Sequence, residues 1–135
     1  MRVLFWFCDR IAWAPVQQTL EDAAPAEPGE ETRVVAAFIH VEPEDVEPGS
    51  SAETKLVKQA KWLARKWEVK RILVHSFTHL GERKAEPAAS GALIARARAR
   101  LKKAGYEAPT TPFGYFNDLE LRAPGHPLAR IYKEW

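Results

Sequence analysis

The chain has 135 residues, 46% of them hydrophobic, which is enough for one compact domain with its own core. The formal net charge of +2 excludes a polycation that coats nucleic acid indiscriminately, although a local basic face remains allowed. A single cysteine excludes an internal disulfide framework, and no apolar stretch is long enough to span a bilayer, so we expect a cytoplasmic protein with no membrane contact. That cysteine, Cys8, follows the apolar run VLFWF and is predicted to be a buried, inert thiol.

The N-terminal third of the chain contains two apolar runs that predict strands. Residues 2–7 are aromatic and branched, which is typical of a strand covered on both faces, and residues 33–41 form a second such run. The segments 24–32 and 42–50 are rich in proline and acidic residues, and we interpret both as solvated loops. The acidic residues in 42–50 lack the ligand spacing of a calcium loop.

A helix is predicted over residues 51–68. Ser50 and Glu53 form a capping-box pattern in front of it, and apolar residues then recur at helical spacing. The opposite face is basic and consists of Lys55, Lys58, Lys61, Arg65 and Lys66. Such a face is either solvated or binds RNA, and an exposed Trp62 beside it would indicate a contact surface.

The remaining elements follow in the order strand, helix, strands and helix. Residues 70–77 predict a third strand, so the strand–helix–strand order favours two parallel neighbouring strands. Pro87 and Gly105 are typical of the two ends of a second helix. After two short strand-like pieces, the sequence HPLARIY predicts a third helix that is interrupted at Trp135, as in a fragment of a longer polypeptide.

The histidines and the residues around them suggest a pocket. His75 and His79 lie in and just after the third predicted strand rather than on a helix, and no zinc-protease motif accompanies them, so a metal site is not predicted. His75 is interpreted as a core or edge residue, whereas His79 lies in a loop of the kind that carries functional side chains. Phe77, Thr78 and His79 are predicted to form one wall of the pocket, and residues 112–118 the other. No phosphate loop, dinucleotide fingerprint or nucleophile elbow is present, so no cofactor is expected.

Three ordered motifs carry a resemblance to a known family. FTHLGE at 77–82, APTTPFGYF at 108–116 and GHPLA at 125–129 resemble the N-terminal editing domain of archaeal threonyl-tRNA synthetases. MRVLFWFCDRI and VVAAFIHVE match that family as well, so the resemblance covers nearly the whole chain, 1–135. It implies an α/β fold like that of D-aminoacyl-tRNA deacylases, with a mixed parallel and antiparallel sheet and about three helices.

The resemblance also implies a function. The family proofreads: it hydrolyses the ester of serine wrongly attached to threonine tRNA and spares threonyl-tRNA. The expected partners are the 3′ end of that tRNA, the remaining synthetase domains and a second copy of the chain in a homodimer. By resemblance, His79 matches the family's histidine and is expected to position substrate or water. The expected substrate contacts are Val41, Phe77, Thr78, Phe113, Gly114, Tyr115 and Phe116.

Two positions depart from the family pattern. Where the family has FGYY followed by lysine, this sequence has Phe116 and then Asn117; where GHPLA continues with glutamate, it has Arg130. We expect Asn117 and Arg130 to be catalytic, on the hypothesis that Arg130 lies close to Asn117 and replaces the missing positive charge. The other explanation is that catalysis rests on backbone groups and the RNA, so that both substitutions are mild. The alternatives are a non-catalytic tRNA-binding or assembly module and a D-aminoacyl-tRNA deacylase. The sequence leaves two basic faces as equal candidates for RNA contact, the 51–68 helix and Arg96 with Arg100.

Overall fold

A computed structural model describes residues 1–135, and it has the mixed α/β architecture that the sequence predicts. The elements in chain order are β1 (Arg2–Gln18), β2 (Gly29–His40), the 3₁₀ turn η1 (Pro43–Val46), α1 (Ala52–Lys66), β3 (Ile72–Ser76), α2 (Pro87–Lys103), β4 (Tyr115–Arg122), the 3₁₀ turn η2 (Pro127–Ala129) and β5 (Arg130–Glu134). Two α-helices and two 3₁₀ turns thus stand where about three helices were expected. No helix is long and apolar enough to cross a membrane.

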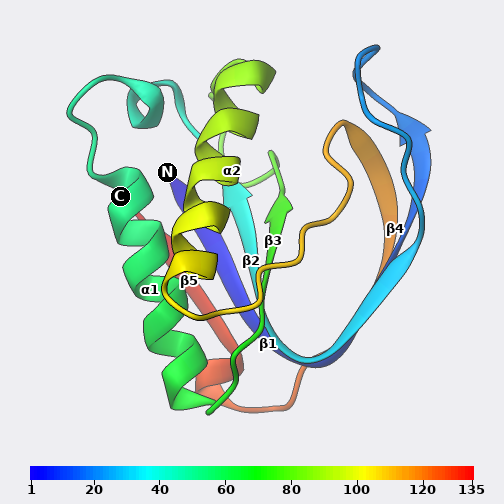
Figure 1. The fold of residues 1–135 in the computed structure, drawn as a ribbon, viewed down its shortest axis with the longest axis vertical. Helices are drawn as coiled ribbons and strands as arrows, with labels where there is room; N and C mark the ends of the chain where they lie inside the picture. Colours follow the sequence, from blue (N-terminus) through cyan, green and yellow to red (C-terminus); the bar gives the residue numbers. More distant parts are fainter.

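One five-stranded sheet organises the molecule. Its strand order is β3-β2-β1-β4, and β5 pairs with the other end of β1. β2 and β3 run parallel and are joined through α1, as predicted, whereas every pairing of β1 is antiparallel. Figure 1 shows both helices against one part of the sheet, while β1 and β2 curve and carry β4 away from the helices.

The main core lies between the sheet and the two helices. Val3, Phe5 and Phe7 of β1 point into it and are at most 1% exposed. The aromatic ring of Trp67, just after α1, stacks on Phe7 with centroids 4.0 Å apart. A smaller cluster on the other face of the sheet contains Cys8, which is buried as predicted. Burial raises the pKa of the Cys8 thiol to about 12, so it stays protonated and unreactive at neutral pH.

The first two strands are longer than the sequence suggests. β1 continues to Gln18 through Pro15, where the register with β4 shifts and no backbone N–H is needed. β2 begins at Gly29, inside the segment that was expected to be a loop. A Cβ at Gly29 would lie 2.5 Å from the Trp13 ring, so only glycine allows this close pairing of the two strands.

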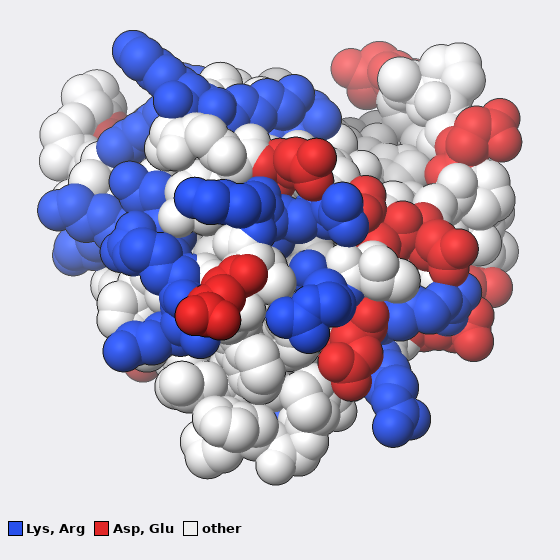
Figure 2. Space-filling model, turned by 60° about the horizontal axis from the view of Figure 1, so that its bottom comes forward, with Lys and Arg blue, Asp and Glu red and all other residues white.

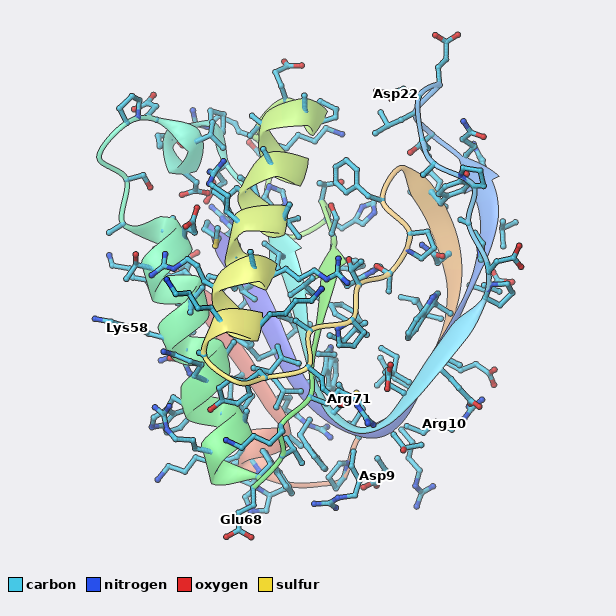
Figure 3. The ribbon with its side chains drawn as sticks, in the orientation of Figure 1. Asp9, Arg10, Asp22, Lys58, Glu68 and Arg71 are labelled. Carbon is cyan, nitrogen blue, oxygen red and sulfur yellow. The ribbon has the colours of Figure 1, made fainter.

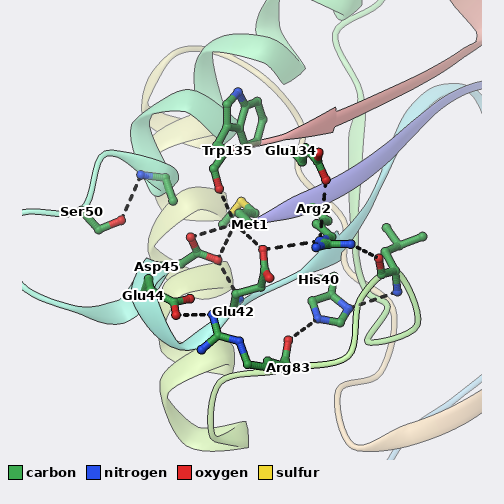
Figure 4. Close-up of polar contacts among 12 residues, drawn as sticks. Met1, Arg2, His40, Glu42, Glu44, Asp45, Ser50, Arg83, Glu134 and Trp135 are labelled. Carbon is green, nitrogen blue, oxygen red and sulfur yellow. Dashed lines mark hydrogen bonds and ion pairs between the residues drawn. The ribbon is translucent and has the colours of Figure 1, made fainter.

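The acidic segment 42–50 is not merely solvated, contrary to expectation. The amino group of Met1 donates to a carboxylate oxygen of Asp45 at 2.8 Å, to Glu42 at 3.0 Å and to the carbonyl of Trp135 at 2.9 Å (Figure 4). The Met1 side chain is fully buried, and that of Asp45 is only 6% exposed. These contacts fix the start of β1, the η1 turn and the end of β5 to one another.

The predicted capping box in front of α1 does not form. The N-cap is Ser51, and the Ser50 hydroxyl accepts a hydrogen bond from the Ala52 N–H at 3.2 Å. The Glu53 carboxylate is engaged elsewhere, because it pairs with Arg96 and Arg100 of α2 at 2.8 and 3.0 Å. The packing of α2 on α1 therefore decides what Glu53 binds.

The predicted C-terminal helix is wrong. His126 closes a single 3₁₀ turn by accepting a hydrogen bond from the Leu128 N–H at 3.0 Å. The chain then becomes β5, whose residues from Arg130 to Glu134 pair with residues 6 to 2 of β1. The first residues of β1 leave an edge that β4 does not reach, and the inter-strand hydrogen bonds gained there outweigh the local helical pattern.

Candidate functional site

The first wall of the site follows β3. The Phe77 N–H donates to the Ile39 carbonyl at 2.8 Å, which extends the parallel pairing by one residue beyond the strand. The chain then turns away, so Thr78 and His79 lie beyond the sheet edge, where α/β proteins usually place functional side chains. The Phe77 and His79 rings meet edge to face with centroids 5.0 Å apart. The predicted wall of Phe77, Thr78 and His79 is therefore present.

The loop after His79 is held by a buried imidazole. His40 at the end of β2 accepts the Leu80 N–H at Nδ1, 3.1 Å away, and its Nε2–H donates to the Arg83 carbonyl at 2.7 Å (Figure 4). Arg2 donates to the Leu80 carbonyl at 3.1 Å, and the Ala85 N–H donates to the Val41 carbonyl at 2.9 Å. This clamp gives the wall a fixed position without blocking it.

The second wall is the turn that enters β4. Gly114 has φ +89°, a left-handed conformation that favours glycine, and a Cβ there would lie 2.9 Å from that of Ala23. Its carbonyl accepts the Thr19 N–H at 2.7 Å, and the Tyr115 hydroxyl donates to the Ala24 carbonyl at 2.7 Å. The segment 19–24 thus supports the turn from behind. The Phe116 ring faces His79 with centroids 6.2 Å apart.

The two walls enclose a pocket of about 400 Å³. Seven predicted residues and the predicted amide line it together: Phe77, Thr78, His79, Phe113, Gly114, Tyr115, Phe116 and Asn117. The side-chain Oδ1 of Asn117 is buried and has no hydrogen-bond partner. The pocket contains no carboxylate, so a substrate amine would find its acceptors among amide and carbonyl oxygens.

Two predicted site residues lie elsewhere. Val41 is 1% exposed and belongs to the main core, so it supports the pocket only through its carbonyl, which holds Ala85. Arg130 lies on β5 opposite Trp6, whereas Asn117 lies on β4 opposite Pro15, about 30 Å further along the path of β1. The guanidinium of Arg130 covers the Trp6 ring and donates to the Pro124 carbonyl. The expected proximity of Arg130 and Asn117 is therefore wrong, because Arg130 belongs to a strand and not to a helix.

His75 and Lys84 also line the pocket, although neither was predicted to do so. His75 is 6% exposed, and its Nδ1 lies 2.7 Å from the Thr111 hydroxyl. Burial, with a smaller contribution from His79, lowers the pKa of His75 to about 4, so it is neutral at pH 7. Lys84 is the one Lys or Arg on the lining. The sequence did contain a signal for His75: side chains alternate along a strand, so His75 and Phe77 lie on the same face.

The chemistry of this pocket is that of binding and positioning. It offers two imidazoles, one ammonium, one unpaired amide oxygen and several hydroxyl groups, but no acid–base–nucleophile triad. No group of three or more His, Cys, Asp or Glu side chains is arranged to hold a metal ion. Such a site suits a substrate that is already activated and needs only a placed water.

The fold is that of D-aminoacyl-tRNA deacylase-like proteins. The chain superposes on a structure titled c-Myc DNA Unwinding Element Binding Protein with a TM-score of 0.71 and 11% identity, covering 100% of this chain and 99% of the other. It superposes on a probable eukaryotic D-amino acid tRNA deacylase with a TM-score of 0.57 and 12% identity, covering 98% of each. At these identities the likeness concerns the fold alone.

The sequence relationship is more specific. Residues 1–135 match the model of the archaea-specific editing domain of threonyl-tRNA synthetase, and the chain belongs to that family. It is 30% identical over 135 residues to the threonine–tRNA ligase of Thermococcus kodakarensis and 31% identical over 134 residues to that of Cenarchaeum symbiosum. These alignments cover 97% and 98% of this chain but 22% and 21% of the relatives, so the chain spans about a fifth of their length.

Proposed function

We propose that this domain proofreads threonine charging by hydrolysing the ester of L-seryl-tRNA(Thr), releasing serine and sparing threonyl-tRNA. The observation that carries the proposal is the pocket in which Phe77–His79 and Phe113–Asn117 converge at the open end of the sheet. Its fold family and its sequence family both favour the cleavage of an aminoacyl ester. Water, rather than a protein nucleophile, is the attacking group.

The need for such a site follows from binding energetics. A synthetase pocket that holds threonine rejects serine poorly, because one missing methyl group changes binding by only about 1–3 kcal/mol. A second site with the opposite preference removes the error by excluding the larger side chain. Phe77, Thr78 and Ser90 line the proposed cavity and narrow it, and backbone and amide groups supply partners for the serine hydroxyl and amine.

The reaction places few demands on the protein. A water oxygen attacks the ester carbon and gives up a proton, and the carbonyl oxygen becomes an oxyanion. As the carbonyl re-forms, the bond to the ribose oxygen breaks and that oxygen takes up the proton. We assign His79 to positioning the water or substrate, and Lys84 to offsetting negative charge near the ester. Neutral His75 keeps the floor of the pocket uncharged. The Asn117 side-chain amide, which lines the pocket, is assigned to hydrogen bonding with the substrate.

A homodimer is part of the proposal. β4 lies at the edge of the sheet, and three apolar side chains on or beside it are exposed: Val16, Phe116 and Leu121, at 65, 51 and 37%. An exposed edge strand with apolar side chains is a ready surface for pairing with a second copy. We expect sedimentation to give twice the mass of the chain, and the exchange of Leu121 for lysine to give monomers.

The second candidate is a tRNA-binding or assembly module without catalysis. It is favoured by the place of Arg130 outside the pocket and by the absence of any carboxylate inside it. The deciding experiment incubates the chain with serine-charged and threonine-charged tRNA(Thr) and counts the released amino acid. Faster release of serine supports editing. Retained tRNA binding with no release above the spontaneous rate supports the module, and equal release of both amino acids contradicts the proposed selectivity.

A further inference from the structure

The basic side chains are segregated to one side of the molecule. The two helices carry ten of the twenty Lys and Arg residues but one of the eighteen acidic residues. Figure 2 shows the consequence, because blue side chains cover the left side, where α1 lies, and red ones gather on the right. A chain with a net charge of only +2 thus presents a strongly basic helical side to its surroundings.

The sequence left two basic faces as equal candidates for RNA contact, and in the structure they differ in how many of their cations are paired with carboxylates. Arg96 and Arg100 of α2 both pair with the single carboxylate of Glu53 of α1, so half of their charge is offset within the protein. The cations on the outer face of α1 make no ion pair: Lys55, Lys58, Lys61 and Arg65. Figure 3 shows Lys58 extending away from α1 into solvent. Of these two faces, the α1 face therefore keeps more of its charge available for a partner.

These cations line a groove rather than a flat surface. The groove measures about 680 Å³ and lies between α1 and β5, which contributes Ile131, Lys133 and Trp135. Five cationic side chains line it and no carboxylate does. The α1 cations follow one another at intervals of three or four residues, so they form one stripe about 15 Å long. Like charges at this spacing repel, and an isolated helix would be more stable without them.

An aromatic ring lies within the stripe. Trp62 is 38% exposed, and the ammonium of Lys66 lies 5.5 Å from its ring centroid. Proteins that bind RNA without reading its sequence combine a cationic groove that follows the backbone with aromatic rings on which bases or sugars stack. The groove shares no residue with the pocket beside His79, so a partner that fills both would contact the domain at two separate places.

We infer that the α1–β5 groove docks the phosphate backbone of the tRNA at a distance from its 3′ end. The inference rests on the proposed function for the identity of the RNA, but the surface is defined by its own charge and shape. The five cations neutralise phosphates, and Trp62 adds a contact that does not depend on salt. A groove of this kind recognises the shape and charge of the RNA and not its base sequence.

The test compares two matched pairs of substitutions. Lys58→Gln/Lys61→Gln removes two charges from the groove, and Lys102→Gln/Lys103→Gln removes two exposed charges from the end of α2. Filter binding with uncharged tRNA(Thr) at several salt concentrations measures the affinity and its salt dependence. The groove pair is expected to weaken binding at least tenfold at low salt and to reduce the slope of log K against log salt by about two. The α2 pair is expected to change neither quantity.

Two further measurements separate this inference from the editing proposal. Trp62→Ala is expected to weaken tRNA binding about tenfold while leaving the salt slope unchanged. The groove pair is expected to raise KM for seryl-tRNA without changing kcat, and to leave hydrolysis of 3′-seryl-adenosine unchanged, because that ester has no phosphate backbone. If the parent chain binds tRNA but hydrolyses neither ester, the editing proposal fails and the groove is still tested by binding.

Three outcomes would overturn the inference. Unchanged tRNA affinity in the groove pair would mean that the stripe faces an acidic protein surface or solvent instead of RNA. Equal losses in the two pairs would mean that the charge acts diffusely and not through this groove. A loss accompanied by an altered thermal transition or circular dichroism spectrum would be assigned to unfolding, and Lys58→Arg/Lys61→Arg, which keeps the charge, must then restore binding for the inference to stand.

Discussion

The Nδ1 atom of His75 lies 2.7 Å from the hydroxyl oxygen of Thr111, and both side chains are buried. This hydrogen bond joins β3 to the segment that leads into the second wall of the pocket. An isolated β-bridge between Val74 and Thr110 lies beside it. The position of the second wall relative to the first therefore depends on a polar contact inside an otherwise apolar region.

Thr111→Val is expected to destabilise the protein by about 1–3 kcal/mol, because valine has the same shape but leaves the buried imidazole nitrogen without a partner. Urea unfolding followed by circular dichroism measures the change. The double variant His75→Phe/Thr111→Val removes both polar groups and should recover much of the loss. If the single variant is as stable as the parent chain, the hydrogen bond contributes nothing to the fold.

Acid is expected to destabilise the chain through His75. Its pKa falls from 6.5 to about 4 on folding, so between these pH values the unfolded chain binds a proton that the folded chain does not. Stability is therefore unaffected by this group above pH 6.5, decreases as the pH falls toward 4, and by then has lost about 3 kcal/mol. Urea unfolding from pH 4 to 7 measures it. His75→Phe/Thr111→Val should show a flatter dependence, and an identical slope in both proteins would contradict the assignment.

Asp45→Asn is expected to cost about 2–3 kcal/mol of stability, because it removes the charge that faces the buried amino group of Met1. Thermal unfolding measures the effect. Glu44→Gln is the matched control, since Glu44 pairs with Arg83 on the surface, where water and salt screen an ion pair and its contribution to stability is small. Similar losses in the two variants would show that the amino terminus is not a structural anchor.

His79→Ala is expected to reduce release of serine from seryl-tRNA(Thr) by about a hundredfold, in line with the loss of a group that positions water or substrate. Binding of uncharged tRNA should stay within twofold, because the side chain is exposed and its ring contacts lie within the pocket, with Phe77 and Phe116. Single-turnover kinetics separates the two effects. A variant with the parent's rate would remove His79 from the reaction.

Asn117→Ala and Arg130→Ala are expected to differ. The first removes a side-chain amide from the pocket lining, and its rate of serine release should fall about tenfold with a higher KM. The second removes a side chain that contacts Trp6 and Pro124, far from the pocket, and its rate should be unchanged. Serine release under identical conditions compares them. If Arg130→Ala released serine more slowly than the parent chain, Arg130 would have to contact the substrate, which its place on β5 does not allow.

The sequence by itself determined the elements whose patterns are local. The helices near 51–68 and 87–105, the parallel crossover into β3 and the wall of Phe77, Thr78 and His79 follow from periodicity, from Pro87 and Gly105 at the helix ends and from the end of an apolar run. The motifs also predicted the family and the fold. Each of these features depends on neighbours in the chain, so residue spacing was sufficient information.

Tertiary structure alone decided the rest. β5 is a strand because β1 offers it an unpaired edge, and that pairing carries Arg130 away from Asn117. Val41 is buried in the main core. Glu53 pairs with Arg96 and Arg100 of α2 instead of capping α1. His75 lines the pocket because the segment from Thr111 to Asn117 lies against the end of β3. In each case a partner distant in sequence outweighs the local preference, since inter-strand hydrogen bonds, burial and opposite charge contribute more free energy than a helical pattern or a cap of about 1 kcal/mol.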